Sequence, residues 1–107
     1  MVELPEFLRR AKAILSDQER AELVDHLAAN PEGGIALGGG LRKIRFAREG
    51  GGKRGGFRTI YVFGGSHMPL FLVTVFAKND KADLTPTEQA AAVALSRQLL
   101  ATYGVKA

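Results

Sequence analysis

Cationic side chains alternate with apolar ones in two neighbouring stretches of this chain, in a pattern that favours contact with phosphate. Residues 41–48 read Leu-Arg-Lys-Ile-Arg-Phe-Ala-Arg, and residues 56–63 read Gly-Phe-Arg-Thr-Ile-Tyr-Val-Phe. Because side chains alternate across a β-strand, Lys43 and Arg45 are expected on one face and Arg42 and Phe46 on the other. A ribbon of positive charge on two adjacent strands suits a polyanion, most simply the phosphate backbone of a nucleic acid.

These residues also suit the cleavage of RNA without a metal. That reaction needs a base for a 2′-hydroxyl, a cation to stabilise extra charge on phosphorus, and an acid for the leaving oxygen. Arg58 is the first candidate for the cation, because arginine is always charged and binds phosphate through two donors. Lys53 and Lys78 both remain open as the proton-transfer group, since crowding by like charges favours a neutral lysine. Other cations are expected to hold flanking phosphates or ribosomal RNA, namely Arg42, Arg45, Arg54 and Lys81.

Ordinary structural explanations compete with these assignments. A single cation on a strand is at least as often a solvated surface residue as a phosphate-binding one. Phe46 and Phe57 are candidates for stacking on bases, but each occurs in a strand pattern that is more typical of a core. His26 is expected on the surface of a helix and His67 in an exposed turn, so a two-histidine nuclease is not favoured.

Two motifs that suggest cofactors fail on their context. Residues 50–55 match the dinucleotide-binding expression G-x-G-x-x-G, but a strand follows them where the motif requires a helix. In a P-loop reading, Arg54 stands where a Ser or Thr should hold magnesium. Asp80 and Asp83 alternate with lysines, as in a solvated loop. The sequence therefore predicts neither a metal nor a cofactor.

Length and charge indicate one small domain, residues 1–107, with an anionic partner. A chain of 107 residues supports one modest core. Residues 1–32 hold four Lys or Arg against seven Asp or Glu, a net charge of −3. Residues 33–81 hold nine against two, a net charge of +7, and residues 82–107 are balanced. This asymmetry favours an anionic partner, the alternative being a solvated basic face.

The remaining composition predicts a cytoplasmic protein with no membrane partner. The chain has no cysteine, which excludes disulfides and thiolate metal sites and suits a reducing compartment. Its longest apolar run, residues 69–77, is much shorter than the roughly 20 residues that cross a bilayer. Acidic residues near the N-terminus differ from the basic start of a signal peptide.

Apolar spacing and capping signals predict an α+β fold. Helices are expected over residues 4–15, from a Ser16–Glu19 capping box to Pro31, and from Thr85, with Pro86 in the first turn and Glu88 completing a second capping box. Strands are expected over residues 35–37, 41–48, 56–63 and 70–77. Because the strands cluster, we expect a three- to four-stranded, mainly antiparallel sheet. The two N-terminal helices should pack antiparallel and shield one of its faces.

Three segments of the chain together resemble the RelE-like toxins of type II toxin–antitoxin modules, specifically the HigB branch. They are Gly-Leu-Arg-Lys-Ile-Arg-Phe at 40–46, Gly-Lys-Arg-Gly-Gly-Phe-Arg-Thr-Ile-Tyr at 52–61 and Val-Phe-Ala-Lys-Asn-Asp-Lys-Ala-Asp-Leu at 75–84. The resemblance covers nearly the whole chain. It implies a RelE-like fold and a metal-independent endoribonuclease that cuts messenger RNA on the ribosome. It also implies a cognate antitoxin that neutralises the toxin within a hetero-oligomer.

The resemblance also assigns residues to the site. Lys43 and Arg45 match the family's basic strand residues, and Arg58 matches the arginine of its Gly-aromatic-Arg motif. Lys78 matches the cation after the last strand, with Lys81 as a second candidate. The chain departs from the family at Arg54, where relatives often carry serine. The alternatives are a non-catalytic RNA- or DNA-binding module that uses the same hairpin, and a structural protein whose cations keep it soluble.

Overall fold

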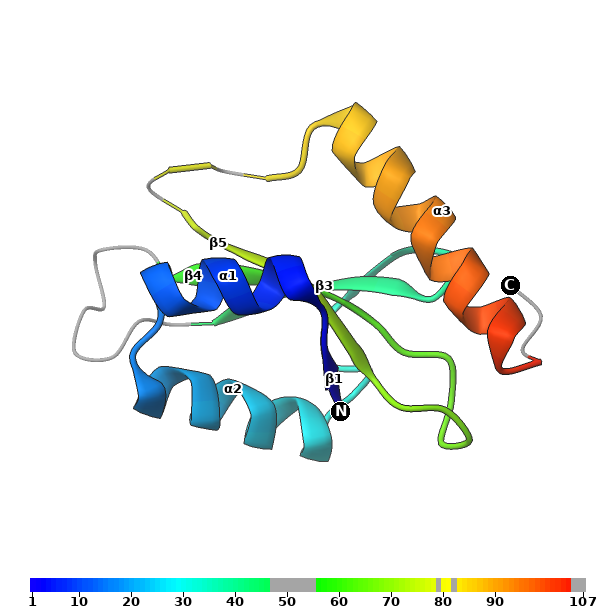
Figure 1. Cartoon of the computed structure of the whole chain (residues 1–107), viewed down its shortest axis with the longest axis horizontal. Helices are drawn as coiled ribbons and strands as arrows, with labels where there is room; N and C mark the ends of the chain where they lie inside the picture. The colour runs from blue at the N-terminus through cyan, green and yellow to red at the C-terminus, as the bar shows by residue number, and fades with distance from the viewer. Residues whose placement is uncertain (47–55, 79, 82, 105–107) are drawn as a thin grey trace.

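The computed structural model describes residues 1–46, 56–78, 80–81 and 83–104. Two helices precede the main strands and one follows them, so the predicted α+β order is confirmed (Figure 1). The described elements are, in order, β1 (Val2–Glu3), α1 (Pro5–Ile14), α2 (Asp17–Ala29), β2 (Ile35–Gly38), β3 (Leu41–Phe46), β4 (Phe57–Val62), β5 (Phe71–Ala77) and α3 (Pro86–Thr102).

The strands form a single mixed sheet in the order β1-β5-β4-β3-β2. β1 runs parallel to β5, and the other neighbours are antiparallel. The described sheet has five strands, one more than the upper limit of the prediction. The additional strand is β1, which has only two residues and therefore shows no alternation in the sequence. It joins the sheet through the Val2 N–H, which donates to the Leu70 carbonyl at 2.8 Å.

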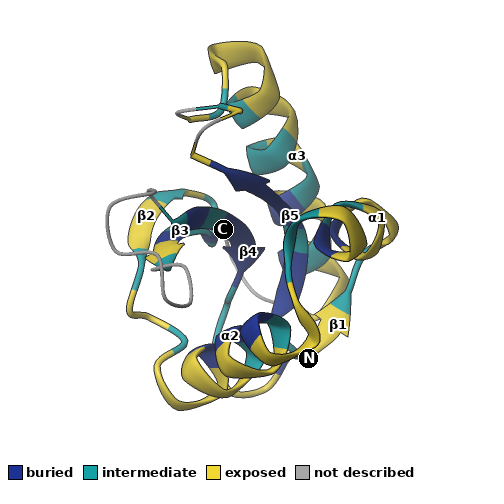
Figure 2. Cartoon of the chain, turned by 90° about the vertical axis from the view of Figure 1, so that its left-hand side faces the viewer, coloured by how far each residue is buried: buried dark blue, intermediate teal, exposed yellow. Residues whose placement is uncertain are grey.

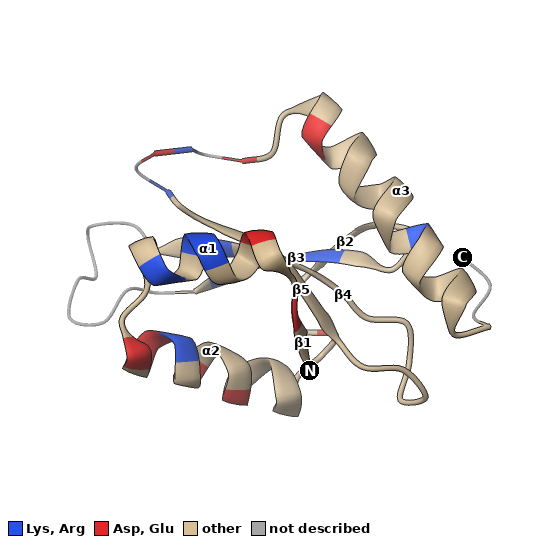
Figure 3. Cartoon of the chain, in the orientation of Figure 1, with Lys and Arg blue, Asp and Glu red and all other residues tan. Residues whose placement is uncertain are grey.

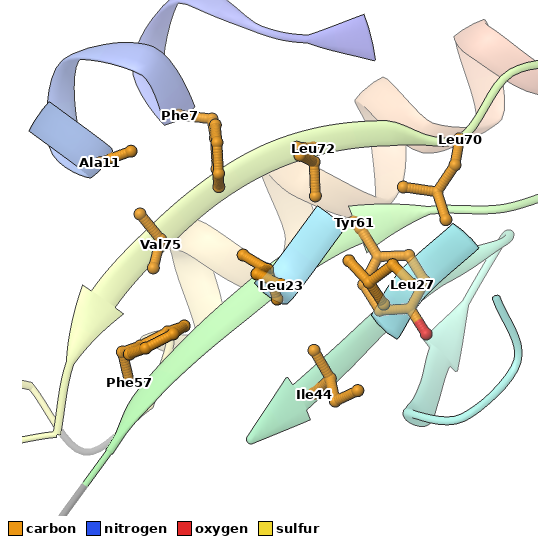
Figure 4. Packing of buried hydrophobic residues seen from close by; sticks show 10 residues of the cluster. All are labelled: Phe7, Ala11, Leu23, Leu27, Ile44, Phe57, Tyr61, Leu70, Leu72 and Val75. Carbon is orange, nitrogen blue, oxygen red and sulfur yellow. The ribbon is translucent and has the colours of Figure 1, made fainter. Parts of the chain in front are cut away.

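The helices α1 and α2 run in opposite directions and cover one face of the sheet, as predicted (Figures 1 and 2). The chain turns between them at the predicted capping box, in which the Ser16 hydroxyl accepts the Glu19 N–H at 3.0 Å and Glu19 accepts the Ser16 N–H at 2.9 Å. Figure 4 shows the core beneath these helices, formed by Phe7, Ala11, Leu23, Leu27, Ile44, Phe57, Tyr61, Leu70, Leu72 and Val75. Burying each large apolar side chain stabilises the fold by about 1.5–3 kcal/mol.

A buried tyrosine fastens the end of α2 to the sheet. The Tyr61 hydroxyl donates to the Pro31 carbonyl at 2.9 Å and accepts the Gly34 N–H at 3.2 Å. A Cβ at position 34 would lie 2.4 Å from the Lys43 carbonyl oxygen, so the strand approaches closely because residue 34 is a glycine. Tyr61 therefore fixes the chain next to β3, the strand that carries Lys43.

The helix α3 covers only one end of the opposite face. Its Leu100 packs with a second core cluster that includes Leu41, Ile60 and Val62. The Ser96 hydroxyl donates to the Gly39 carbonyl, which ties the C-terminal half of the helix to the turn before β3. The N-terminal half rises away from the sheet, as Figure 1 shows. It begins at the predicted cap, where Thr85 and Glu88 form a capping box and Pro86 occupies the first turn.

Candidate nucleic-acid interface

The pairing of β3 with β4 places three cations on the face that α3 covers only in part. Lys43 pairs with Ile60 and Arg45 pairs with Arg58. Ile60 belongs to the cluster beneath α3, so Lys43 lies on that face, and Arg45 and Arg58 follow it by alternation. Side chains directly opposite in an antiparallel pair are roughly 5 Å apart at Cβ, and like charges there are destabilising. Arg45 and Arg58 therefore form a cationic pair that a bound anion would stabilise.

Arg58 has two donor groups that stand out among the described residues. Its Nε and Nη1 atoms are shielded from solvent and have no hydrogen-bond partner among the described residues. Elsewhere in the described chain, such atoms occur once each in Arg10, Arg42 and Thr59. Buried polar groups are normally hydrogen-bonded. Arg58 is thus a positioned guanidinium with free donors, the group that best matches the oxygens of a phosphate.

Lys43 is already paired with a carboxylate. Its Nζ lies 2.6 Å from Asp83 Oδ2, and the Lys43 side chain is 16% exposed against 48% for Asp83. The hydrogen bond from Lys43 lowers the pKa of Asp83, with further lowering by the Leu84 N–H and by the charges of Lys43 and Arg58. The carboxylate therefore lies within the field of the sheet cations. This contact joins residues 40 positions apart, so no local pattern in the sequence predicts it.

The loop between β5 and α3 brings further charge to the same end of the sheet (Figure 3). Lys78 follows β5 directly, and its N–H donates to the Gly56 carbonyl at 3.2 Å, beside the start of β4. The Lys78 side chain is exposed. Lys81 pairs with Glu88 at the start of α3, and its Nζ lies 5.7 Å from the centre of the Phe76 ring. Phe76 in turn pairs with Arg58 across the strands, so the Phe76 ring lies between Lys81 and Arg58 in this chain of contacts. Lys78 reaches the same end of the sheet through Gly56, two residues before Arg58.

Arg42 and Phe46, expected to bind RNA, lie on the other face of the sheet. The Arg42 Nη2 atom donates to the carbonyls of Glu32 and Gly34 at 2.9 and 2.8 Å. Phe46 packs on Phe57 and His26, with ring centres 5.5 and 5.4 Å apart. The strand alternation separates both residues from Lys43, Arg45 and Arg58. Their contacts here are structural ones beside α2.

Lys53 and Arg54, expected as a proton-transfer group and a phosphate contact, fall outside the described residues. They belong to the connection between β3 and β4, whose facing ends are the pair Phe46 and Phe57.

An apolar cleft lies beside the loop between β5 and α3. It has a volume of about 550 Å³ and lies between the first turns of α1, the strand β5 and the N-terminal half of α3. Lys81 and Glu88 stand on its lining beside apolar residues such as Phe76 and Leu95. Within the described residues, no three His, Asp or Glu side chains are arranged to hold a metal ion. None of the helices in that part of the chain is long and apolar enough to cross a membrane.

The molecule is thus a small α+β protein with a helix-covered face and a cationic face on one sheet. A family model described as the RelE toxin of the RelE/RelB toxin–antitoxin system matches residues 5–106. The chain belongs to this family. It is a toxin of a toxin–antitoxin system, in a family whose members are generally endoribonucleases and which implies an antitoxin partner.

Proposed function

We propose that this toxin is a metal-independent endoribonuclease of the HigB branch that cuts messenger RNA on the ribosome and so inhibits translation. The observation that carries the proposal is Arg58, which faces Arg45 across the strands and keeps two shielded donors without a described partner. Such an arrangement is unfavourable without an anion. The family match supports RNA as this anion, because RelE toxins are generally endoribonucleases.

In the proposed reaction, the 2′-oxygen of one nucleotide bonds to the adjacent phosphorus, and the bond from phosphorus to the 5′-oxygen breaks. The products are a 2′,3′-cyclic phosphate and a 5′-hydroxyl end. Arg58 stabilises the extra negative charge on phosphorus, while Arg45 and Lys43 hold neighbouring phosphates. One group takes the proton of the 2′-hydroxyl and one protonates the leaving oxygen. Lys53 and Lys78 are the candidates for this proton transfer, Lys78 standing beside the first residue of β4.

Partner and location follow from the same proposal. A cognate antitoxin neutralises the toxin in a hetero-oligomeric complex, and the toxin acts in the cytoplasm, where ribosomes hold translated messages. Contacts to ribosomal RNA would use cations beyond those at the cleaved bond, with Lys81 and Arg54 as candidates. Coexpression with the antitoxin should relieve the growth defect that the toxin alone causes.

The exposure of Lys78 favours a second candidate function, a module that binds RNA or DNA with the same face and does not cut it. Proton acceptance by a lysine requires desolvation or crowding by like charge. Lys78 is exposed in the free protein. In the binding-module alternative, Arg58 and Arg45 would hold phosphates, and messages would remain intact.

Inducible expression in a bacterium separates these two functions. We would compare wild type, Arg58→Ala, Arg58→Lys and the control Arg9→Ala, following growth and mapping new 5′ ends on messages. Arg9 suits the control because its side chain is 70% exposed on α1, away from the cationic face. We expect growth arrest and new ends with wild type and Arg9→Ala, and neither with Arg58→Ala. Arg58→Lys should restore little, because lysine lacks the bidentate fork.

Intact messages in cells that contain folded wild-type protein would contradict the nuclease and leave the binding module. Cutting by Arg58→Ala at the wild-type level would keep the nuclease and remove Arg58 from its site.

A further inference from the structure

The ion pair between Lys43 and Asp83 places a protein carboxylate at a position where the proposed function needs an RNA phosphate. Lys43 Nζ lies 2.6 Å from Asp83 Oδ2. Lys43 is also one of the three cations that β3 and β4 present on the cationic face. The charge of Arg58 acts on the same carboxylate. Asp83 therefore partly neutralises the site that we assign to RNA.

We propose that Asp83 is a built-in counter-ion that competes with an RNA phosphate for Lys43 and so sets the affinity of the cationic face for RNA. This inference rests on the proposed RNA-binding role of that face. It assigns a function to a residue that the sequence pattern indicated only as part of a solvated loop.

The attachment of the loop allows the carboxylate to be exchanged without refolding. The loop is held at both of its ends, by β5 before it and by the capped start of α3 after it. Lys81 adds a second tie through its pair with Glu88. Asp83 itself is 48% exposed, so a rotation of its side chain returns the carboxylate to water. The same rotation releases the Leu84 N–H, which Asp83 Oδ1 accepts at 2.8 Å. A phosphate can then take the place at Lys43 while the pair of Lys81 with Glu88 and the two ends of the loop keep their contacts.

RNA binding in which a phosphate replaces the Asp83 carboxylate at Lys43 should depend on salt differently from binding at an unpaired lysine. When a lysine neutralises a phosphate, the nucleic acid releases a counterion, and this makes binding weaker as salt rises. In the wild type, the displaced Asp83 regains a free negative charge and takes up a cation in its turn. The two effects oppose each other, so Lys43 should contribute little to the salt dependence while Asp83 is present.

A purely structural ion pair makes the opposite prediction for affinity. If Asp83 only fastened the loop, its replacement would leave RNA binding unchanged or weaken it by loosening the site. If Asp83 competes with phosphate, its replacement strengthens RNA binding. A gain in affinity is therefore a result that damage to the fold would not produce.

The test uses fluorescence anisotropy with a short 2′-O-methyl RNA oligonucleotide, which cannot be cleaved by attack of a 2′-hydroxyl. Five full-length proteins are compared between 50 and 200 mM salt: wild type, Asp83→Asn, Asp80→Asn, Lys43→Ala and Lys43→Ala/Asp83→Asn. Asp80 is the matched control, because it is an exposed acid of the same loop that forms no ion pair with a described residue. Its replacement removes the same charge without releasing Lys43.

We expect Asp83→Asn to bind the oligonucleotide about three- to tenfold more tightly at the lowest salt, and Asp80→Asn to bind much as the wild type does. The salt slope of Asp83→Asn should be steeper by up to about 0.7, so that its advantage shrinks roughly threefold across the salt range. In the Lys43→Ala background, the gain from Asp83→Asn should largely disappear.

Three results would overturn the inference while leaving the RNA face intact: no gain with Asp83→Asn, an equal gain with Asp80→Asn, or a full gain in the Lys43→Ala background. Failure of every folded variant to bind RNA would instead remove the proposed RNA face, and the inference with it. The two failures are therefore distinguishable by the binding of the wild type.

Discussion

On the cationic face, Arg58 and Asp83 have opposite effects on the charge that is available to an anion. Arg58 has two shielded nitrogens without a partner in the described chain, an arrangement that reduces stability until an anion arrives. Asp83 supplies an anion to the neighbouring Lys43 instead. In the free protein, Lys43 is therefore neutralised by Asp83, while Arg58 keeps donors without a described partner. In the proposed function, the balance between the two would set how strongly the face attracts RNA.

The Lys43–Asp83 ion pair should make the unfolding free energy of the protein depend on pH. The folded-state pKa of Asp83 is lowered, so the pair's contribution to the unfolding free energy is present above about pH 4 and is lost as the pH falls through the lowered value. Because Asp83 is half exposed, we expect Asp83→Asn to reduce stability at pH 7 by at most about 1 kcal/mol. Urea unfolding at several pH values should show this difference shrink as the pH falls below about 4.

Asp80→Asn serves as the control for that measurement, and its difference from wild type should stay small at every pH. A deficit of Asp83→Asn that persists unchanged at the lowest pH would contradict the ion pair as its cause.

The sequence predicts the sheet face of a residue wherever this face depends only on the alternation of side chains along a strand. The period of two in residues 41–46 was enough to put Lys43 and Arg45 on one face and Arg42 and Phe46 on the other, as the register of β3 confirms. The same pattern could not reveal the partner of Lys43. Asp83 reaches it from a loop 40 residues away, and nothing in its local sequence marks an ion pair.

Among the elements, the connection from α2 into β2 depends on Tyr61. We expect Tyr61→Phe to lower the unfolding free energy by about 1–3 kcal/mol, because the Gly34 N–H and the Pro31 carbonyl would lose their partner in a part-buried place. Chemical denaturation measures this change. Tyr103→Phe is the matched control, since Tyr103 is exposed at the end of α3, and it should change stability by less than about 0.5 kcal/mol. Equal losses in the two variants would contradict the role of the Tyr61 hydroxyl.

Element boundaries were predictable wherever a short-range signal sets them. The two capping boxes, at Ser16 and at Thr85, each lie within four residues and fix the starts of α2 and α3. The strand β1 gave no such signal. Nor did the irregular register between β4 and β5, where Ile60 pairs with Thr74 and Tyr61 pairs with Leu72. Because β5 is apolar on both faces, its sequence has no alternation that an extra residue could interrupt.

Across the whole molecule, the main apolar core and the three sheet cations lie on opposite faces of one sheet, and a second core cluster beneath α3 shares the cationic face. The two N-terminal helices carry the acidic part of the chain and the main apolar core, while Lys43, Arg45 and Arg58 lie on the other face. Loss of a cation should therefore alter function more than folding. This separation makes the variants of the cationic face suitable for tests of activity.

The most direct test of the central claim is cleavage of a defined message by the purified toxin, with and without translating ribosomes, followed by analysis of the new ends. We expect cleavage in the presence of ribosomes, with 5′-hydroxyl ends from attack by the 2′-hydroxyl. Arg58→Ala, checked for folding, should cut at least about 100-fold more slowly. An intact message with folded wild type on translating ribosomes, or equal cleavage by Arg58→Ala, would contradict the account.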